Sequence, residues 1–255
     1  MKRFCAVSVL LLLLAANGAA LAARAKCVAS SGPTRAALLE LYTSEGCNSC
    51  PLADRRLSDL REQAPRGVVP LAFHVDYWNR LGWIDRFSRP AWSERQGRVA
   101  ARHRSSTVYT PQFVLNGQNW RDWRGDLPEP GAERAVASLR LRLHAAAKGR
   151  LEFSGDARIR EAKAGAQVTL VLYENGLTSR IVAGENAGSL LKHDFVVRQL
   201  LGPFPLPETG RLRLREAFAL EADWKPENLG VSAFIDHAET GEVYQALRLH
   251  MCKKR

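Results

Sequence analysis

Residues 38–64 read LLELYTSEGCNSCPLADRRLSDLREQA, and this stretch decides the fold that we expect. The apolar, alternating run Leu38–Thr43 predicts a strand, and Ser44–Gly46 predict a turn after it. Apolar residues then recur at helical spacing over Pro51–Ala64. The order strand, Cys47-x-x-Cys50, helix therefore places both cysteines where a strand turns into a helix.

A Cys-x-x-Cys pair is shared by redox sites and metal sites, so its context has to decide between them. The unpaired amides and positive dipole end of a helix stabilise a thiolate, which favours Cys47 as a nucleophile. Cys47 would attack a substrate disulfide, and Cys50 would then attack Cys47 to release the product. A purely structural disulfide is the alternative, although so short a loop constrains the chain little.

A second motif, Thr110-Pro111, lies about 60 residues downstream, ahead of a predicted strand over Gln112–Leu115. A thioredoxin fold places a cis-proline beside its active disulfide at this point, and proline is nearly the only residue that forms a cis bond at low cost. We therefore expect a cis bond here. Asn116-Gly117 predicts a hairpin turn, with the return strand over Trp120–Trp123.

The remaining elements of the first half complete a thioredoxin-like α/β domain over residues 24–149. Val68–Val75 predicts a buried strand of a parallel sheet. Pro90 fits the first turn of a crossover helix over Ala91–His103. A last helix is predicted over Ala132–Lys148, with Gly149 as its C-cap.

After Gly149 the pattern changes to short alternating runs, which predict an all-β sandwich, jelly-roll-like, over residues 150–255. The seven predicted strands are Leu151–Ile159, Gln167–Tyr173, Arg180–Ala183, Phe195–Leu200, Leu212–Leu220, Val231–Ile235 and Val243–Leu249.

The first 23 residues read as a cleaved signal peptide. Lys2 and Arg3 precede the apolar run Cys5–Ala16, and Ala20–Ala22 form a small-residue cleavage site. The apolar run is shorter than the roughly 20 residues that span a bilayer, so we expect no stable membrane anchor. The expected location is the periplasm or the exterior of the cell.

The chain is basic, with 37 Lys and Arg against 26 Asp and Glu and a formal net charge of +11. Nucleic-acid binders usually concentrate such charge in one patch, whereas the arginines here are spread over both halves of the sequence. We therefore expect no nucleic-acid partner. The partners that the cysteine pair predicts are protein or small-molecule thiols and disulfides, with a recycling partner that the sequence does not identify.

Two further cysteines lie near the ends of the mature chain, Cys27 and Cys252. The termini of a compact protein are often close together, and an oxidising compartment favours disulfides. We expect Cys27 and Cys252 to form a structural disulfide. Two separate thiols are the alternative.

Several segments resemble the secreted thioredoxin-like family known as domain of unknown function 1223. They are residues 39–51 (LELYTSEGCNSCP), 74–83 (HVDYWNRLGW), 94–96 (ERQ), 110–117 (TPQFVLNG) and 184–198 (GENAGSLLKHDFVVR). The resemblance covers both predicted domains. It implies the fold and the exported location, but no established substrate.

The sequence departs from ordinary thioredoxins at Leu41, where they carry a buried acid. Glu40 is one position away, and strand alternation turns it to the opposite face. We nominate His74 and Asp76, at the end of the second strand, as the groups that exchange a proton with Cys50, with hydrogen bonding in local turns as the alternative. The predicted catalytic set is Cys47, Cys50, Thr110, Pro111, His74 and Asp76.

Two other functions stay open at this point. Cys47, Cys50 and His74 could bind Cu(I), because thiolates select soft ions. The chain could also be a binding protein with a vestigial disulfide. His193 and Asp194 could bind a ligand, with loop hydrogen bonding as the alternative. The leading hypothesis needs no cofactor beyond the Cys47–Cys50 disulfide, and it leaves the direction of electron flow open.

Overall fold

The segment with the two cysteines folds as strand, turn and helix in the computed structural model, which describes residues 27–63, 67–127, 133–147, 149–161 and 164–251. Strand β2 (Ala37–Thr43) is buried along its whole length, and helix α1 (Cys50–Gln63) follows it. Strand β3 (Val68–His74) pairs with β2 in parallel, so α1 is the crossover between them. The two strands and the helix predicted here are confirmed.

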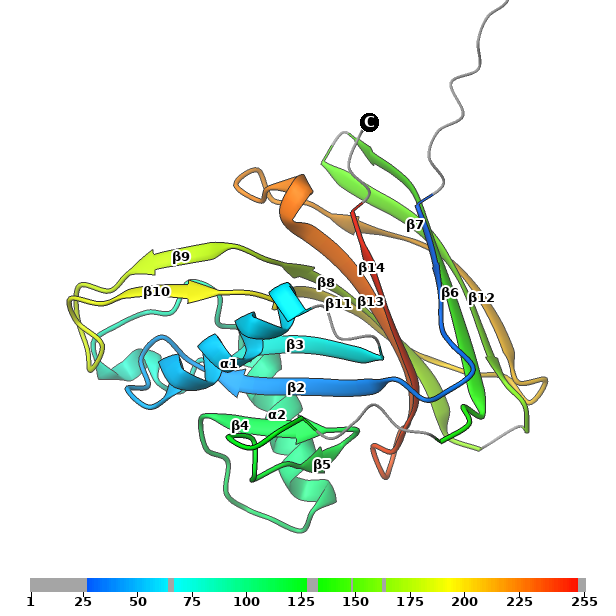
Figure 1. The fold of residues 1–255 in the computed structure, drawn as a ribbon, viewed down its shortest axis with the longest axis horizontal. Coiled ribbons are helices and arrows are strands. Elements are labelled where there is room, and N and C mark those ends of the chain that lie inside the picture. Colours follow the sequence, from blue (N-terminus) through cyan, green and yellow to red (C-terminus); the bar gives the residue numbers. More distant parts are fainter. Residues whose placement is uncertain (1–26, 64–66, 128–132, 148, 162–163, 252–255) are drawn as a thin grey trace, which may run out of the picture.

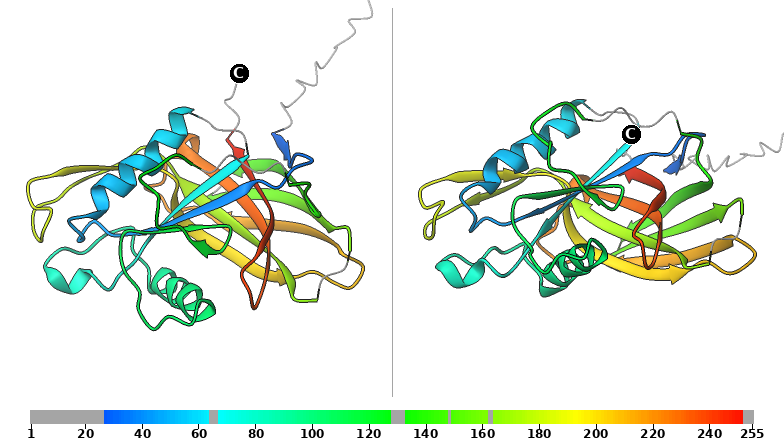
Figure 2. Two further views of the ribbon diagram at one scale, coloured as in Figure 1. Left: turned by 60° about the horizontal axis from the view of Figure 1, so that its bottom comes forward. Right: turned by 90° about the horizontal axis from the view of Figure 1, so that it is seen from below.

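The next elements extend this unit on the other side of β2. Helix α2 (Pro90–Arg102) begins at the predicted proline, and strand β4 (Gln112–Leu115) pairs antiparallel with β2. The predicted Asn116-Gly117 turn is confirmed, because both residues have positive φ angles, 51° and 85°. The return strand predicted over Trp120–Trp123 is wrong, since β5 is only Gln118–Asn119. Helices α1 and α2 lie on opposite faces of the sheet (Figure 2).

One sheet of eight strands runs through the molecule in the order β14-β13-β8-β11-β3-β2-β4-β5. Its later strands are β8 (Ala166–Glu174), β11 (Val196–Pro205), β13 (Leu229–His237) and β14 (Val243–His250). Strand β11 joins β3 in parallel through Val196 and Ala72. The predicted boundary near Gly149 therefore does not separate two sheets (Figure 1).

The second sheet has four strands in the order β1-β6-β7-β12. They are β1 (Val28–Ser30), β6 (Ala137–Ala147), β7 (Arg150–Ile159) and β12 (Arg211–Ala219). Strand β6 shows that the helix predicted over Ala132–Lys148 is wrong. Leu139 and Leu141 are buried while Arg140 is exposed, and this period of two is the signature of a strand. The many good helix formers in this segment hid the alternation.

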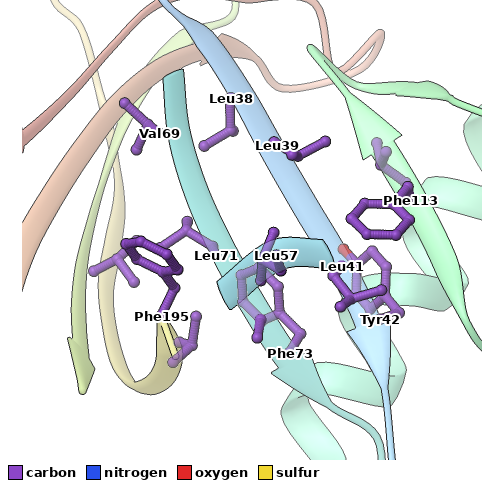
Figure 3. Packing of buried hydrophobic residues seen from close by; sticks show 14 of the residues in the cluster. Leu38, Leu39, Leu41, Tyr42, Leu57, Val69, Leu71, Phe73, Phe113 and Phe195 are labelled. Atoms are coloured by element: carbon purple, nitrogen blue, oxygen red, sulfur yellow. The ribbon is translucent and has the colours of Figure 1, made fainter. Parts of the chain in front are cut away.

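Two hydrophobic cores hold the layers together. The four-stranded sheet packs through Leu141 and Phe153 on Leu170 of β8 and Ala233 of β13, all in one buried cluster. The other core lies around β2, β3 and α1, and Figure 3 shows Leu57 of α1 among the side chains of β2 and β3. This second core fixes the start of α1, and hence the cysteines, against the end of β2.

A long hairpin carries the chain from the eight-stranded sheet toward the cysteines. Strands β9 (Leu177–Arg180) and β10 (Leu190–His193) pair with each other and continue the directions of β8 and β11 (Figure 1). The strand predicted over Arg180–Ala183 is thus shifted, and β10 was not predicted. Short 3-10 helices cover Asn79–Leu81 and Pro226–Asn228. In the described ranges, no helix is long and apolar enough to cross a membrane.

Candidate functional site

Cys47 and Cys50 form a disulfide, with their Cα atoms 5.4 Å apart. Cys50 is the first residue of α1, whereas Cys47 lies in the turn before it, where its amide donates to the carbonyl of Ser44 at 3.2 Å. Both cysteines are buried, with Cys47 1% exposed and Cys50 fully inaccessible. The disulfide is therefore covered by other parts of the chain.

The Thr110-Pro111 bond is cis, as predicted. The pairing of Tyr42 with Gln112 places Pro111 next to the end of β2. Trp78 connects the two segments, because its Nε1 donates to Thr110 Oγ1 at 2.8 Å and its Cβ would lie 3.1 Å from a Cβ on Gly46. Residues from three segments thus meet around the cysteines.

A buried pair of His74 and Asp85 lies at the end of β3. Nδ1 of His74 and Oδ2 of Asp85 are 2.7 Å apart, and neither side chain is exposed. Asp85 also accepts from the amides of Glu45 and Phe87, each at 2.9 Å. Burial opposes both charges, yet Asp85 outweighs it and raises the pKa of His74, while His74 and the amides lower the pKa of Asp85. The pair is held in its charged form.

A second buried histidine, His193 of β10, lies against His74 and contacts two more carboxylates. Its Nε2 is 3.2 Å from Glu45 Oε1 and its Nδ1 is 3.6 Å from Asp54 Oδ2. The rings of His193 and His74 meet edge to face, with centroids 4.9 Å apart. We call these five residues, His74, Asp85, His193, Glu45 and Asp54, the buried polar cluster.

The two carboxyl groups beside His193, those of Glu45 and Asp54, have pKa values shifted in opposite directions. Burial acts to raise the pKa of Glu45, but the interaction with His193, together with weaker ones that include the bond from Trp83 Nε1 at 2.8 Å, outweighs burial and lowers this pKa. Burial dominates at Asp54 and raises its pKa despite His193 and His74. Asp54 is therefore the carboxyl in the cluster whose surroundings favour the protonated form.

Asp54 and Cys50 lie one helical turn apart on the same face of α1. Residues at this spacing have Cβ atoms about 5–6 Å apart. Glu45 precedes Cys47 by two residues, so each cysteine has a member of the cluster close to it along the chain. The acid that is missing at Leu41 thus has two candidate replacements, Glu45 and Asp54, in addition to His74. The i, i+4 spacing of Cys50 and Asp54 was the signal available for one of them.

Some of the candidate residues predicted from the sequence belong to the buried polar cluster, and the others are bonded elsewhere. His74 belongs to the buried polar cluster, but half-buried Asp76 instead bonds Ser93 of α2 through its amide and its carboxylate. Glu40 forms an ion pair at 2.7 Å with Arg95 on the α2 side of the sheet. His193, left open between ligand binding and loop hydrogen bonding, is a member of the cluster, while Asp194 pairs with Arg61 at 2.7 Å.

The tip of the β9–β10 hairpin, residues 181–189, covers Cys47. Nδ2 of Asn186 donates to the carbonyls of Glu45 at 2.8 Å and Cys47 at 3.0 Å, and Asn186 is itself buried. The carboxylate of Glu185 accepts from the amide of Asn48 at 3.1 Å. Attack on the disulfide from solvent therefore requires the hairpin tip to move.

Replacing Asn186 with alanine should speed the reduction of the Cys47–Cys50 disulfide by dithiothreitol. The change removes two hydrogen bonds, worth together about 2 kcal/mol, and so should raise the population of the open tip by roughly 30-fold. Val182→Ala, at an exposed position of the same tip, should leave the rate unchanged. Equal rates for Asn186→Ala and the unaltered protein would show that the tip does not control access.

The metal alternative is not supported by the arrangement of side chains. Among the residues that the structure describes, no group of three or more His, Cys, Asp and Glu is placed to hold a metal ion. The sulfurs of Cys47 and Cys50 are bonded to each other, and Nδ1 of His74 is bonded to Asp85.

The expected structural disulfide involves Cys252, which lies outside the described residues. Its predicted partner Cys27 precedes β1 and is buried. The Sγ atom of Cys27 is 3.4 Å from the carbonyl oxygen of His250 at the end of β14. The pairing of Cys27 with Cys252 stays a prediction.

Fold and site together define a mixed-sheet protein with a covered disulfide above a buried His and carboxylate cluster. Residues 38–236 match the model of the family described as "Protein of unknown function (DUF1223)". The chain belongs to this family. A sequence comparison with curated proteins finds no match.

Two solved structures share the fold. The crystal structure of a protein from Agrobacterium tumefaciens has 20% sequence identity and a TM-score of 0.59, over 88% of this chain and 98% of that one. HBP35 of Porphyromonas gingivalis has 16% identity and a TM-score of 0.63, over 88% of this chain and 80% of that one. At such identities the likeness concerns the fold alone.

Proposed function

We propose that the protein is a thiol-disulfide oxidoreductase that works through Cys47 and Cys50. The observation that carries this proposal is the disulfide at the start of α1, flanked by the cis Thr110-Pro111 loop and lying above buried ionisable side chains. Perturbed ionisable groups beside a reactive pair are typical of functional sites. A disulfide that only stabilised the fold would need none of these neighbours.

The proposed activity rests on a thioredoxin-like unit formed by β2, α1, β3, α2, β4 and β5. Three features support it: β2 lies between a parallel β3 and an antiparallel β4, the cysteines lie between β2 and α1, and the cis-proline directly precedes β4. The strands after Gly149 would form a sandwich-like β region on this unit. Its part in the activity would include the hairpin that covers Cys47.

The exchange consists of two balanced steps. In the reduced protein the Cys47 thiolate attacks one sulfur of a substrate disulfide, a mixed disulfide forms, and the displaced substrate sulfur takes up a proton. Cys50 then loses its proton and attacks Sγ of Cys47, which re-forms the Cys47–Cys50 disulfide and releases the second substrate thiol. Two electrons pass from the protein to the substrate, and the reverse sequence oxidises a substrate dithiol.

The setting and partners belong to the same proposal. We place the protein outside the cytoplasm, because residues 1–23 have the pattern of a signal peptide and disulfides persist in oxidising compartments. Its partners would be protein or small-molecule thiols and disulfides, and one of these would recycle the cysteine pair. The disulfide itself would be the redox group.

One observation favours a second function, a binding protein with an inert disulfide. Cys47 is 1% exposed, whereas an attacking thiolate must reach its substrate. The two functions differ in what the hairpin tip does, since an oxidoreductase needs it to open and a binding protein does not.

Equilibration with glutathione tests the proposed function. The protein is incubated in buffers of known ratio of reduced to oxidised glutathione, and the oxidised fraction of the pair is measured by alkylation and mass spectrometry. We expect a two-electron equilibrium with a reduction potential of about −270 mV for a reductase or about −120 mV for an oxidase. A potential below about −300 mV, the range of structural disulfides, would contradict the proposal and favour the binding protein.

A further inference from the structure

Two short segments far apart in the sequence alternate arginine with leucine. Residues 140–143 read RLRL and residues 211–215 read RLRLR. In a strand this alternation turns the leucines to one face and the arginines to the other. The segments form β6 and β12, which lie on either side of β7, so both sets of arginines reach the same outer face of the four-stranded sheet.

The strand register stacks these side chains in adjacent rows. Asp156 of β7 lies between Arg140 and Arg213, and Ser154 lies between Arg142 and Arg215. The next row joins Arg158 to Arg211. The resulting arginine face contains six arginines: Arg140, Arg142, Arg158, Arg211, Arg213 and Arg215.

This face is exposed and scarcely neutralised. Five of the six arginines are exposed, and the side chain of Arg213 is 88% exposed. Within the described part of the chain their one ion-pair partner is Asp156, 3.7 Å from Arg213. A hollow of about 180 Å³ lies among Arg140, Arg142, Ser154 and Asp156, with room for a small anionic group.

We propose that the arginine face binds the surface of an anionic phospholipid bilayer. Charge complementarity carries the proposal, because arginine binds phosphate oxygens in its planar fork and, of these six, only Arg213 has an ion-pair partner among the described residues. The array extends over three strands and is about 10 Å across at the usual strand spacing. A flat anionic surface can contact all three strands at once, whereas a single extended polyanion would follow only one row of arginines. At the described outward positions of β6, β7 and β12 there is no Phe, Tyr or Trp on which a nucleic-acid base could stack, and the ring of His144 is bonded to Ser154 at 2.9 Å.

The orientation of the face fits this role. The four-stranded sheet lies at one end of the molecule, and the β9–β10 hairpin with the covered disulfide lies at the other (Figure 1). A protein held by the arginine face would thus present its cysteines away from the lipid. The inference does not depend on the proposed redox activity, because it rests on a different sheet and different side chains.

Vesicle sedimentation tests the proposal. The mature protein should sediment with vesicles of phosphatidylglycerol and phosphatidylcholine at 0.1 M salt, but not with phosphatidylcholine alone, and binding should fall at 0.5 M salt because added salt screens the charges. One arginine near an anionic surface strengthens binding by roughly fivefold. The triple variant Arg140→Gln, Arg142→Gln, Arg213→Gln should therefore bind about 100-fold more weakly.

A matched variant distinguishes the contribution of the arginine face to vesicle binding from that of the net charge of the protein. Arg55→Gln, Arg98→Gln and Arg180→Gln remove the same charge from exposed positions on α1, α2 and β9. This control should keep most of the binding. Equal losses in the two triple variants, no binding to anionic vesicles, or tighter binding to duplex DNA than to vesicles at the same salt concentration would overturn the proposal.

Discussion

Replacing Cys47 with serine is expected to reduce the rate of disulfide exchange to the uncatalysed background. The thiolate is the nucleophile in this reaction, and a serine hydroxyl stays protonated at neutral pH and attacks disulfides poorly. The measurement is the release of thiol from a model peptide disulfide by the reduced protein. Cys50→Ser should behave differently, because Cys47 can still attack, and it should accumulate a mixed disulfide visible by mass spectrometry.

The control for this result removes other cysteines. Cys27→Ser combined with Cys252→Ser should keep most of the exchange rate, since Cys27 lies beside β1 and β14 and not near α1. Full exchange activity in Cys47→Ser would refute the proposed role of the pair. Loss of activity in the Cys27 and Cys252 variant with an unchanged circular dichroism spectrum would mean that the reactive thiol had been misassigned.

The fold could be predicted best where the sequence pattern and the burial agree. Continuous or alternating apolar runs bounded by clear turns predict strands β2, β3 and β4. The alanine, leucine and arginine of β6 favour a helix by propensity, whereas the alternation of Leu and Arg indicates the strand that the structure contains. No local signal could show that β11 would pair with β3, since that contact joins residues more than 100 positions apart.

In the candidate site, too, some residues can be predicted from a local sequence signal, and others reach the site only through long-range packing. The cysteine pair, the cis-proline and His74 each carry a local signal, and the structure brings them to one end of the sheet. His193 lies more than 140 positions from Cys50 and reaches the site only because the hairpin folds back over α1. Asp76 was a reasonable nominee from its position, but its orientation toward Ser93 depends on how α2 packs.

The arrangement of charges could not be read from composition either. The arginines are spread along the sequence, and this spread favoured the view that they form no patch. Pairing of β6 and β12 with β7 nevertheless gathers six of them on one face. Sequence distance is thus a poor guide to charge clustering in a protein dominated by long-range strand pairing.

Replacing Asp54 with asparagine should slow the attack of Cys50 on a mixed disulfide at Cys47 by about 10²–10⁴-fold, the usual effect of losing a general base. Asp54 lies one helical turn from Cys50, is buried, and is the carboxyl of the cluster whose pKa is raised on balance, chiefly by burial. It is therefore suited to take the Cys50 proton. The measurement is a single-turnover experiment in which a chromophoric thiol is released from Cys47.

The pH profile separates this role from a structural one. Only the ionised carboxylate accepts a proton, so the rate in the unaltered protein should rise with pH through the raised pKa of Asp54, and this rise should be absent from Asp54→Asn. Because the pKa is raised, ionised Asp54 costs folding free energy above its unfolded pKa of about 3.9. Asp54→Asn should thus be no less stable at pH 7. Asp76→Asn should keep the normal rate and profile, and an equal loss there would show that Asp54 has no special part in the proton transfer.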